Sequence, residues 1–463
     1  MPFAFYDLET TGLDPAFNQP LQFAAILVDD NFVELERVNL RCHLSSHILP
    51  SPYAMVVTGV TPEEATGTSL PSYLEFAQQI RSIIQKWAPA TWVGYNTIGF
   101  DEPCLRQMFY QTLQPNLYET QFNGNDRLDI MLAVQSTWVY QPSIFTWPEN
   151  HKGQPILKLD QLAPANGFGN HDAHDALGDV EATIHIARMI RDKAPSLWSN
   201  ILLNRNKHSV SERLQRFAPM ELALRFGGAP RAYTGCFCGF SADNTNSAGF
   251  FDLNIADPAD YVDADDDTLA NAVSASPIVI RSISINNAPN LFDARSNDPK
   301  LFDKASLVQA RPDFQKRVSR ALAARYKDRE LDENRPVETK MYEGFYSNTD
   351  KALLRDFQSS DWKLRADIIE QLEDPRLKQL GHRLIAFNSP RDLDNKTNIA
   401  ALEYLRNKWL TPADDEPKWT SFDTAENDLL EIEEKGLATV DVIADWRAFF
   451  EDRKRDLEMG LLP

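Results

Sequence analysis

The sequence predicts an α/β fold in its N-terminal part, followed by a β-rich region and then an all-helical region. Three observations support this order. Residues 1–195 alternate short apolar runs with amphipathic stretches, residues 217–291 hold short β-type runs separated by Gly, Asn, Asp and Pro, and the composition after Tyr346 becomes polar and helical. The chain has 463 residues, enough for about three domains of ordinary size. We expect them at residues 1–195, 203–345 and 350–463.

The N-terminal elements follow from periodicity and from turn residues. Strands are expected where apolar or alternating runs are joined by short turns, at Phe3–Leu8, Gln22–Asp29, Phe32–His43 and Thr91–Tyr95. Helices are expected where apolar residues recur every three or four positions, at Ser72–Trp87, Asp101–Leu113, Leu128–Val139 and Asp175–Lys193. The run Pro142–Pro155 is interrupted by prolines and is expected to be a loop.

The later regions differ in pattern. Short β-type runs at Gly235–Phe240, Gly249–Leu253 and Ile278–Ile285 indicate a small barrel or sandwich, and the acidic run Asp257–Asp267 is expected to be a solvated loop. Amphipathic stretches then predict helices at Asp350–Phe357, Trp362–Leu372, Asn398–Leu410, Asp423–Lys435 and Thr439–Arg455.

Composition excludes several classes of protein. Hydrophobic residues make up 43% of the chain and charged residues 25%, which is typical of globular proteins and not of disordered ones. No apolar stretch approaches the ~18–20 residues of a membrane span, and Met1 runs directly into a strand-like segment without a signal peptide, so we expect a cytoplasmic protein without a membrane span. The net charge of −20 argues against coating of nucleic acid by charge alone, but it leaves room for a nuclease with one basic channel.

The first motif with chemical potential is Asp7-Leu8-Glu9, at the end of the first expected strand. Side chains two positions apart on a strand point to the same face, so Asp7 and Glu9 place two carboxylates side by side. Adjacent negative charges are stabilised by a divalent cation with oxygen ligands. The alternative is an ordinary surface Asp-x-Glu at a strand end.

Two further acidic motifs lie downstream. Asp101 opens an expected helix just after the strand that ends at Tyr95, where it could also be a plain helix cap. His174 and Asp179 are five residues apart, which leaves them ~140° apart on an ideal helix, so His174 is expected in the loop before the helix that carries Asp179. The alternatives are a loop histidine beside an acidic cap and an exposed helix acid. His171 and His185 are expected to be structural residues.

Taken together, Asp7, Glu9, Asp101, Asp179 and His174 resemble the site of the DEDDh exonucleases of the ribonuclease H-like fold, over nearly all of the first 195 residues. Further segments narrow the resemblance to the bacterial exodeoxyribonuclease I family: Gln22–Ile26, Gly94–Asn96, Trp147–Asn150, Ala165–Gly167 and Arg205–His208. The resemblance implies an exonuclease domain with a mixed central sheet, an SH3-like domain and a C-terminal helical domain, arranged as a C around a channel for single-stranded DNA.

The resemblance also implies a reaction and a set of roles. The family hydrolyses the terminal phosphodiester at the 3′ end of single-stranded DNA, in DNA repair and recombination, and releases 5′-mononucleotides. Asp7, Glu9, Asp101 and Asp179 would hold two Mg²⁺ ions, for which Mn²⁺ should substitute. Asp7 would bridge the ions and Asp101 would bind directly or through water. His174 would be the general base, because an ordinary histidine pKa of ~6.5 lies near working pH.

Candidate DNA-binding residues are cationic, aromatic or adjacent to the metals, because stacking tolerates any base and phosphates need neutralising. They are Glu9, Arg106, Tyr118, Lys158, Arg205, Lys207 and His208. The alternative for each cation is a solvated surface residue. The family also binds the acidic, Phe-ending tail of single-stranded DNA-binding protein, and we expect a monomer. Two alternative functions are an RNA-directed exonuclease resembling oligoribonuclease or RNase T, and an inactive DNA-binding clamp.

Overall fold

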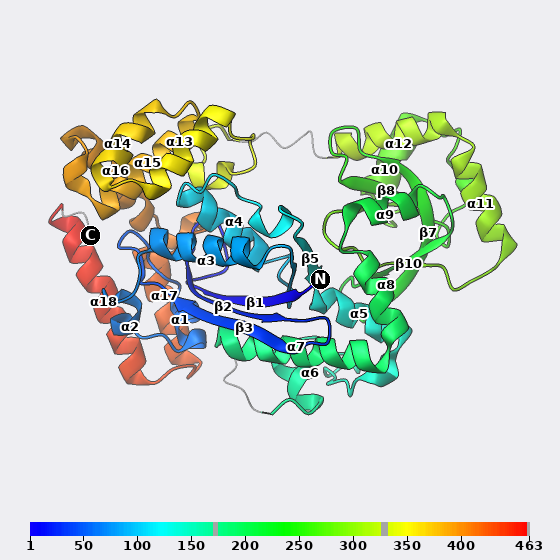
Figure 1. Cartoon of the computed structure of the whole chain (residues 1–463), viewed down its shortest axis with the longest axis horizontal. Helices are drawn as coiled ribbons and strands as arrows, with labels where there is room; N and C mark the ends of the chain where they lie inside the picture. The colour runs from blue at the N-terminus through cyan, green and yellow to red at the C-terminus, as the bar shows by residue number, and fades with distance from the viewer. Residues whose placement is uncertain (170–174, 326–331, 461–463) are drawn as a thin grey trace.

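A five-stranded mixed sheet forms the centre of the N-terminal part of the protein (Figure 1). The computed structural model describes residues 1–169, 175–325 and 332–460. The strand order is β3-β2-β1-β4-β5, in which β1 pairs antiparallel with β2 and parallel with β4. The strands are β1 (Phe3–Thr10), β2 (Pro20–Val28), β3 (Glu34–Arg41), β4 (Thr91–Gly94) and β5 (Asp126–Asp129). The predicted mixed sheet is therefore confirmed.

The central strands are buried on both faces because helices cover the sheet from both sides. Along β1, Phe3 and Phe5 pack into one apolar cluster and Tyr6 and Leu8 into another, as strand alternation requires. Helices α3 (Tyr73–Trp87) and α4 (Asp101–Gln111) contribute to the cluster of Tyr6, whereas α5 (Ile130–Tyr140) and α7 (Ala176–Lys193) contribute to the cluster of Phe5. Figure 1 shows α3 and α7 on opposite sides of the sheet. Asp7 and Glu9 alternate with Tyr6 and so share the face of α7.

The helix expected over Leu128–Val139 is wrong at its N-terminal end. The chain forms strand β5 up to Asp129 and only then begins α5. A four-residue strand carries no readable periodicity, and its conformation comes from parallel pairing with β4. The Asp129 carboxylate caps α5 by accepting a hydrogen bond from the Met131 backbone N–H at 2.9 Å.

Smaller helices complete this part of the chain. They are α1 (Pro52–Thr58), α2 (Pro62–Thr66) and α6 (Leu159–Ala165), and α8 (Pro195–Leu203) and α9 (Lys207–Leu214) then lead to the second sheet. Residues 142–155 have little regular structure beyond one short 3₁₀ turn at Pro142–Ile144, as expected for a loop.

The second sheet is antiparallel, with the order β10-β6-β7-β8-β9. Its strands are β6 (Met220–Leu224), β7 (Arg231–Phe240), β8 (Ser247–Asp252), β9 (Ile280–Ser284) and β10 (Leu291–Asp293). Three helices that were not predicted pack against it: α10 (Asp266–Ser274), α11 (Pro299–Gln309) and α12 (Pro312–Ala324). The acidic run is therefore only partly a loop, because Asp265 caps α10 through the Thr268 backbone N–H at 2.8 Å.

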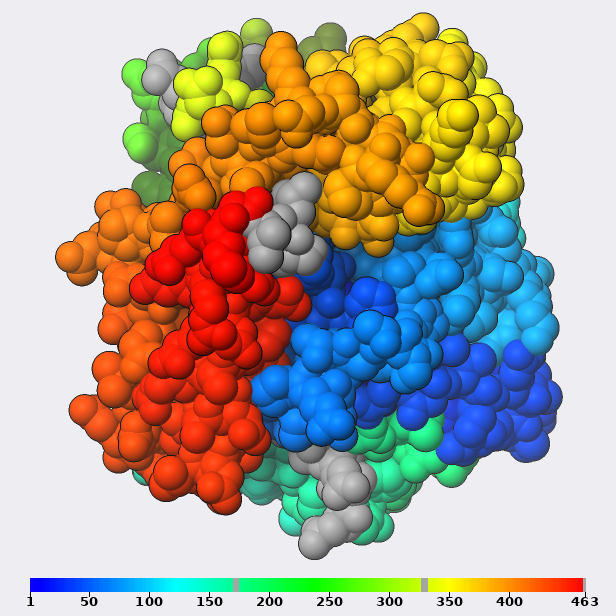
Figure 2. All heavy atoms as spheres, turned by 90° about the vertical axis from the view of Figure 1, so that its left-hand side faces the viewer, coloured from blue at the N-terminus to red at the C-terminus, as the bar shows by residue number. Residues whose placement is uncertain are grey.

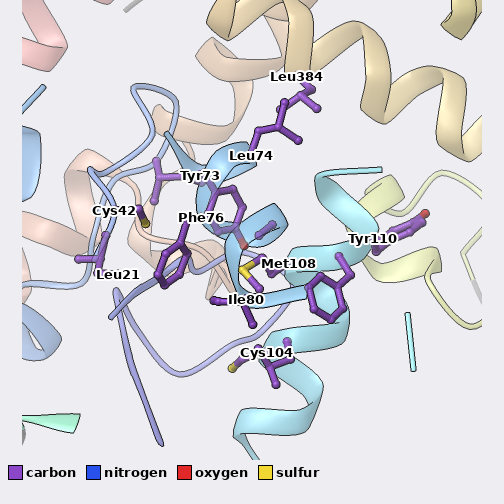
Figure 3. Packing of buried hydrophobic residues seen from close by; sticks show 14 of the residues in the cluster. Leu21, Cys42, Tyr73, Leu74, Phe76, Ile80, Cys104, Met108, Tyr110 and Leu384 are labelled. Carbon is purple, nitrogen blue, oxygen red and sulfur yellow. The ribbon is translucent and has the colours of Figure 1, made fainter. Parts of the chain in front are cut away.

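The predicted helical region at the C-terminus is confirmed. Its helices are α13 (Asn348–Ser359), α14 (Trp362–Gln371), α15 (Pro375–Asn388), α16 (Asn395–Trp409), α17 (Phe422–Glu434) and α18 (Val440–Glu458). One apolar core runs from the first sheet through α3 and α4 into these helices (Figure 3). Figure 2 shows α18, in red, against the blue N-terminal part of the chain. The first sheet lies between the C-terminal helices and the second sheet (Figure 1). The expected domain boundaries stay predictions.

Within the described ranges, no helix is both long enough and apolar enough to cross a membrane.

Candidate active site

Three of the four predicted carboxylates meet at the C-terminal end of β1. Asp7 and Glu9 extend from the strand, and Asp179 comes from the first turn of α7, which packs along that strand. Each offers a carboxylate oxygen, and these oxygens all lie within 4.8 Å of one another. Strand alternation and the packing of one helix along the strand thus bring Asp179 to within reach of side chains that are 170 and 172 positions away in the sequence.

The fourth carboxylate, Asp101, is held beside this group by a backbone contact. It accepts a hydrogen bond from the Leu8 N–H at 3.1 Å, which ties the start of α4 to the strand between Asp7 and Glu9. Asp101 is only 3% exposed. It lies outside the compact group of three oxygens, at a position from which its charge still acts on Asp7.

Burial and mutual repulsion raise the pKa values of these acids. Burial is the largest cause for Asp7, Glu9 and Asp101, and the charges of neighbouring carboxylates add to it for Asp7 and Glu9. The pKa of Glu9 rises to about 8 and that of Asp101 to about 8, while the pKa of Asp7 rises well above its ordinary range. A site of acidic oxygens that resists ionisation without a cation fits a hard divalent metal, and nitrogen or sulfur ligands are absent among the described members of the group.

One neighbour of the site, Asp175, escaped the sequence-based prediction of site residues. Asp175 accepts hydrogen bonds from Gln22 Nε2 at 2.8 Å and from an Arg41 guanidinium nitrogen at 3.2 Å, and its charge raises the pKa values of Asp7 and Glu9.

The loop between β4 and α4 is fixed by a further buried acid, Asp129. Its carboxylate accepts hydrogen bonds from the Asn96 N–H at 2.9 Å and the Ile98 N–H at 3.2 Å. Asn96 has a φ of 66°, a left-handed conformation that asparagine tolerates better than most residues. Together these contacts set the position at which α4 presents Asp101.

His174 and His171 lie outside the described residues. The role of His174 as general base therefore stays a prediction. His185, on α7, bonds through Nε2 to the Asn166 carbonyl oxygen at 2.9 Å, a structural contact as expected.

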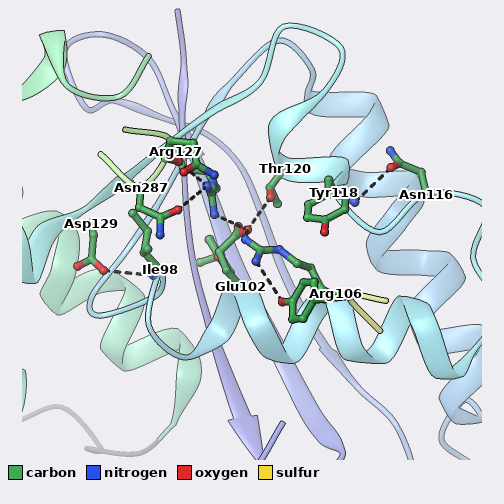
Figure 4. Close-up of polar contacts among 12 residues, drawn as sticks. Ile98, Glu102, Arg106, Asn116, Tyr118, Thr120, Arg127, Asp129 and Asn287 are labelled. Atoms are coloured by element: carbon green, nitrogen blue, oxygen red, sulfur yellow. Dashed lines mark hydrogen bonds and ion pairs between the residues drawn. The ribbon is translucent and has the colours of Figure 1, made fainter. Parts of the chain in front are cut away.

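Glu102, next to Asp101, anchors a buried polar network (Figure 4). Its carboxylate accepts hydrogen bonds from the Tyr6 hydroxyl at 3.0 Å and from the Thr120 hydroxyl at 3.0 Å. It also pairs with Arg106 at 3.0 Å and with Arg127 at 3.1 Å. Although burial opposes ionisation, these two guanidinium groups and the hydrogen bonds lower the pKa of Glu102 overall.

Two DNA-binding candidates, Arg106 and Tyr118, belong to this network around Glu102 and not to the group of carboxylates at the end of β1. Arg106 pairs with Glu102, lies over the Tyr118 ring at 5.3 Å and reaches the Tyr342 hydroxyl at 3.4 Å. Arg127 extends the network to the second sheet region by donating to the Asn286 carbonyl oxygen at 2.7 Å. Arg106 and Tyr118 therefore help to join parts of the chain that are more than 200 residues apart.

The other basic candidates lie elsewhere on the surface. Lys158 is exposed just before α6, and Lys207 is exposed at the start of α9. His208 lies 3.3 Å from Glu212, and Arg205 pairs with Asp126 of β5 at 3.1 Å. Their DNA contacts stay predictions.

Comparison with known proteins places the chain among characterised relatives. The family profile "Exonuclease" matches residues 4–187, and the profile "Exonuclease I C-terminal domain" matches residues 335–453. Exodeoxyribonuclease I of Escherichia coli strain K12 is 27% identical over 429 residues, which cover 87% of this chain and 89% of the relative. That of Buchnera aphidicola subsp. Schizaphis graminum is 30% identical over 465 residues, which cover 92% of this chain and 93% of the relative.

Solved structures agree over nearly the whole length. The crystal structure of E. coli Exonuclease I in complex with a dA16 oligonucleotide has a TM-score of 0.84 at 25% identity, covering 98% of this chain and 99% of the other. The crystal structure of SSB/Exonuclease I in complex with the inhibitor CFAM has a TM-score of 0.82 at 25% identity with the same coverage. The match extends over both sheets and the C-terminal helices, and the chain is an exonuclease that belongs to the exodeoxyribonuclease I family.

Proposed function

We propose that this protein degrades single-stranded DNA from its 3′ end and releases 5′-mononucleotides. The observation that carries the proposal is the convergence of Asp7, Glu9 and Asp179 oxygens within 4.8 Å, with Asp101 held beside them, in a chain of the exodeoxyribonuclease I family. The relatives bear the name exodeoxyribonuclease I, and the E. coli enzyme was crystallised with single oligonucleotides. Both facts favour DNA as the substrate.

The reaction depends on divalent metal, and we assign this role to two Mg²⁺ ions, with Mn²⁺ as a substitute. Asp7, Glu9 and Asp179 would hold the ions, and Asp101 beside them would contribute a further carboxylate. When bound, the ions supply an activated water and neutralise charge on the phosphate and on the leaving 3′-oxygen. His174 would receive the proton of the attacking water.

The DNA strand would approach over exposed cations and aromatic groups. Lys158, Lys207 and His208 are exposed and can neutralise phosphates. Arg106 is already paired with Glu102, so its contribution to DNA binding would come through the rings of Tyr118 and Tyr342 that it orients. Arg205 is likewise already paired, with Asp126 of β5, so its contribution to DNA binding would also be indirect.

The test uses full-length protein, Mg²⁺ and a 3′-labelled single strand. Asp7→Ala and Asp179→Ala should abolish release of labelled mononucleotide while single-strand binding is largely retained. Asp192→Ala, which changes an exposed acid on the same helix as Asp179, should behave as the unaltered enzyme. Substantial turnover by Asp179→Ala would remove that residue from the site. His174→Ala should fold normally and hydrolyse slowly, and an unaltered rate would transfer the base role to another residue.

A matched RNA oligomer separates the proposed function from an RNA-directed exonuclease. We expect DNA to be degraded much faster than RNA of the same sequence. Equal or faster degradation of RNA would overturn the substrate assignment. Loss of metal-dependent release from both oligomers would leave a DNA-binding clamp, which the complete set of carboxylates argues against.

For the partner, we propose that the acidic, Phe-ending tail of single-stranded DNA-binding protein docks in a groove of about 940 Å³ between β7 and α12. The lining of the groove includes the aromatic side chains of Phe217, Phe237 and Phe240, the cations Lys316, Arg317 and Arg320, and one acid, Asp313. An aromatic end group with acidic neighbours is complementary to such a surface. A solved structure of SSB/Exonuclease I is similar to this chain.

The docking proposal is tested with a synthetic tail peptide. Lys316→Glu with Arg320→Glu should weaken peptide binding at least tenfold and leave degradation of naked DNA unchanged, and a peptide without the terminal Phe should bind the unaltered protein poorly. Undiminished binding by the double variant would place the tail elsewhere. We further propose that the enzyme acts as a monomer in the cytoplasm, and light scattering at 52.5 kDa would support the monomer.

A further inference from the structure

A polar cavity of about 230 Å³ lies where the N-terminal part of the chain meets the C-terminal helices. One wall is the segment 43–47 that follows β3, together with the end of α2 and Tyr73 at the start of α3. The opposite wall is the end of α15, with Phe387 and Asn388, and Arg453 of α18. The cavity shares no lining residue with the group of carboxylates at the end of β1.

The cavity is lined by hydrogen-bond donors and carries no negative charge. Arg453, two histidines and five hydroxyl side chains line it, the full set being His43, Leu44, Ser45, Ser46, His47, Thr66, Thr68, Tyr73, Phe387, Asn388 and Arg453. No aspartate or glutamate is among these described lining residues, although the chain contains 67 of them. Guanidinium is a donor without acceptor capacity, so the lining is chemically matched to an anion.

Two polar atoms at this cavity are buried without a partner. Among the residues that the structure describes, Ser46 Oγ and His47 Nδ1 have no hydrogen-bond partner. The His47 ring is held flat against Phe387, with ring centroids 4.4 Å apart and planes 12° apart, which fixes the direction of its edge. Buried polar atoms in native proteins are nearly always satisfied, so these two call for a bound group or ordered water.

Arg453 lacks the carboxylate partner that neighbouring arginines have. No carboxylate of the described residues lies within 4.0 Å of its guanidinium, which lies over the Phe449 ring, 5.3 Å from the ring centroid. By contrast, Arg447 on the same helix pairs with Glu426 at 3.4 Å and with Glu433 at 3.7 Å. Asp456 is the acid whose charge acts on Arg453, and burial lowers the pKa of Arg453 despite it.

The surroundings add positive charge. Burial first, and then the charges of Lys408, Arg383 and Arg453, lower the pKa of His47 to about 3, so His47 is neutral at physiological pH. A neutral imidazole can donate one hydrogen bond from Nδ1 while the neighbouring cations supply the charge. Part of the positive charge is compensated by Glu338, which pairs with Arg383 at 2.6 Å.

We propose that this cavity binds a small oxyanion of the phosphate type, held by the Arg453 guanidinium, Ser46 Oγ and His47 Nδ1. The volume of 230 Å³ is below the ~300–1,000 Å³ of usual small-molecule pockets, which favours a single oxyanion over a whole nucleotide. Because Ser46 and Arg453 come from opposite ends of the chain, the anion would join the first sheet region to the C-terminal helices. The anion is either free phosphate or a phosphate group of the DNA backbone.

The test titrates inorganic phosphate into the full-length protein in EDTA, with chloride adjusted so that ionic strength is constant. EDTA removes divalent metals, so phosphate cannot bind through the carboxylate site. Calorimetry should show saturable binding, and the thermal midpoint should rise along the same curve, as linkage requires. Arg453→Met should raise the Kd for phosphate at least tenfold, and Ser46→Ala should raise it several-fold with little effect on folding.

Arg447→Met is the matched control, because it removes an arginine from the same helix outside the cavity, and its Kd should match that of the unaltered protein. Affinity for a dT oligomer under the same conditions separates the two sources. A tenfold loss with Arg453→Met assigns the site to backbone phosphate, whereas unchanged DNA affinity assigns it to the free anion. Absence of saturable phosphate binding, or equal Kd values for Ser46→Ala, Arg453→Met and Arg447→Met, would overturn the proposal.

Discussion

Replacing Glu9 by Gln should stabilise the metal-free protein while it removes nuclease activity. In the absence of a cation, Glu9 lies among the carboxylates of Asp7, Asp179 and Asp101, and burial together with their charges raises its pKa to about 8. Gln keeps the shape of the side chain and cannot ionise. The variant therefore loses a metal ligand and also loses a source of repulsion.

The size of the expected change in the free energy of unfolding can be worked out in two ways. At a separation of 4.8 Å, two full charges repel by ~3.5 kcal/mol at the effective dielectric constant of ~20 that suits such sites. Holding the Glu9 carboxyl protonated at pH 7, against an ordinary pKa of 4.5, costs about 3 kcal/mol, since each tenfold change in proton affinity is worth ~1.4 kcal/mol. The unfolded chain keeps part of these interactions, so we expect Glu9→Gln to raise the free energy of unfolding by roughly 1–3 kcal/mol in EDTA.

The pH dependence gives a second, more specific readout. Between pH 4.5 and 8 the folded protein binds more protons at Glu9 than the unfolded chain does, so this residue's contribution makes stability fall as pH rises through that window. Glu9→Gln should flatten that slope. Urea unfolding in EDTA at several pH values measures both the gain and the slope. Millimolar Mg²⁺ should raise the thermal midpoint of the unaltered protein and have a smaller effect on the variant.

Glu36→Gln is the control, because Glu36 lies on β3 of the same sheet, is paired with exposed Lys86 at 2.6 Å and has a lowered pKa. Its replacement should change stability little, and in the opposite direction. A Glu9→Gln variant that is less stable than the unaltered protein in EDTA, or that retains full turnover, would contradict the repulsion among these carboxylates.

Three further outcomes follow from the structure. Glu102→Gln should lower the free energy of unfolding by ~3–5 kcal/mol in urea titrations, because it leaves the buried guanidinium groups of Arg106 and Arg127 without their carboxylate. An unchanged urea midpoint would contradict a stabilising role for these two ion pairs. Gly94→Ala should lower the free energy of unfolding by ~1–3 kcal/mol and also slow turnover, because the new Cβ would lie 2.7 Å from the Tyr6 carbonyl oxygen, at the base of the loop that leads to Asp101. Full activity at normal stability would contradict the close approach. Burial, with a smaller contribution from the charge of Arg383, lowers the pKa of Lys408 to about 8. The contribution of Lys408 to the free energy of unfolding should therefore increase as pH rises from 8 to 10.5, and Lys408→Met should remove this pH dependence of thermal unfolding. An identical pH dependence in the variant would show that another group titrates.

Local pattern along the chain determined much of the site and of the fold. Alternation on β1 already places Asp7 and Glu9 on one face, and the helix that carries Asp179 is recognisable from its apolar spacing. The mixed sheet follows from the resemblance of the motifs, and the C-terminal helical region follows from its amphipathic stretches. By contrast, α12 was not predicted although Phe314, Val318 and Leu322 recur at helical spacing, so that omission was avoidable.

Only the folded chain decided which partner each charged group meets. Arg106 was expected to face DNA, yet it pairs with Glu102, and Asp101 owes its place to the backbone N–H of Leu8, 93 positions away. Strand β5 exists because β4 offers it a parallel edge, not because four residues favour a strand. Periodicity and propensity depend on residues that are neighbours in the sequence. Ion pairs, short strands and the cavity at Arg453 depend on how segments distant in the sequence pack against one another, and no local pattern encodes that packing.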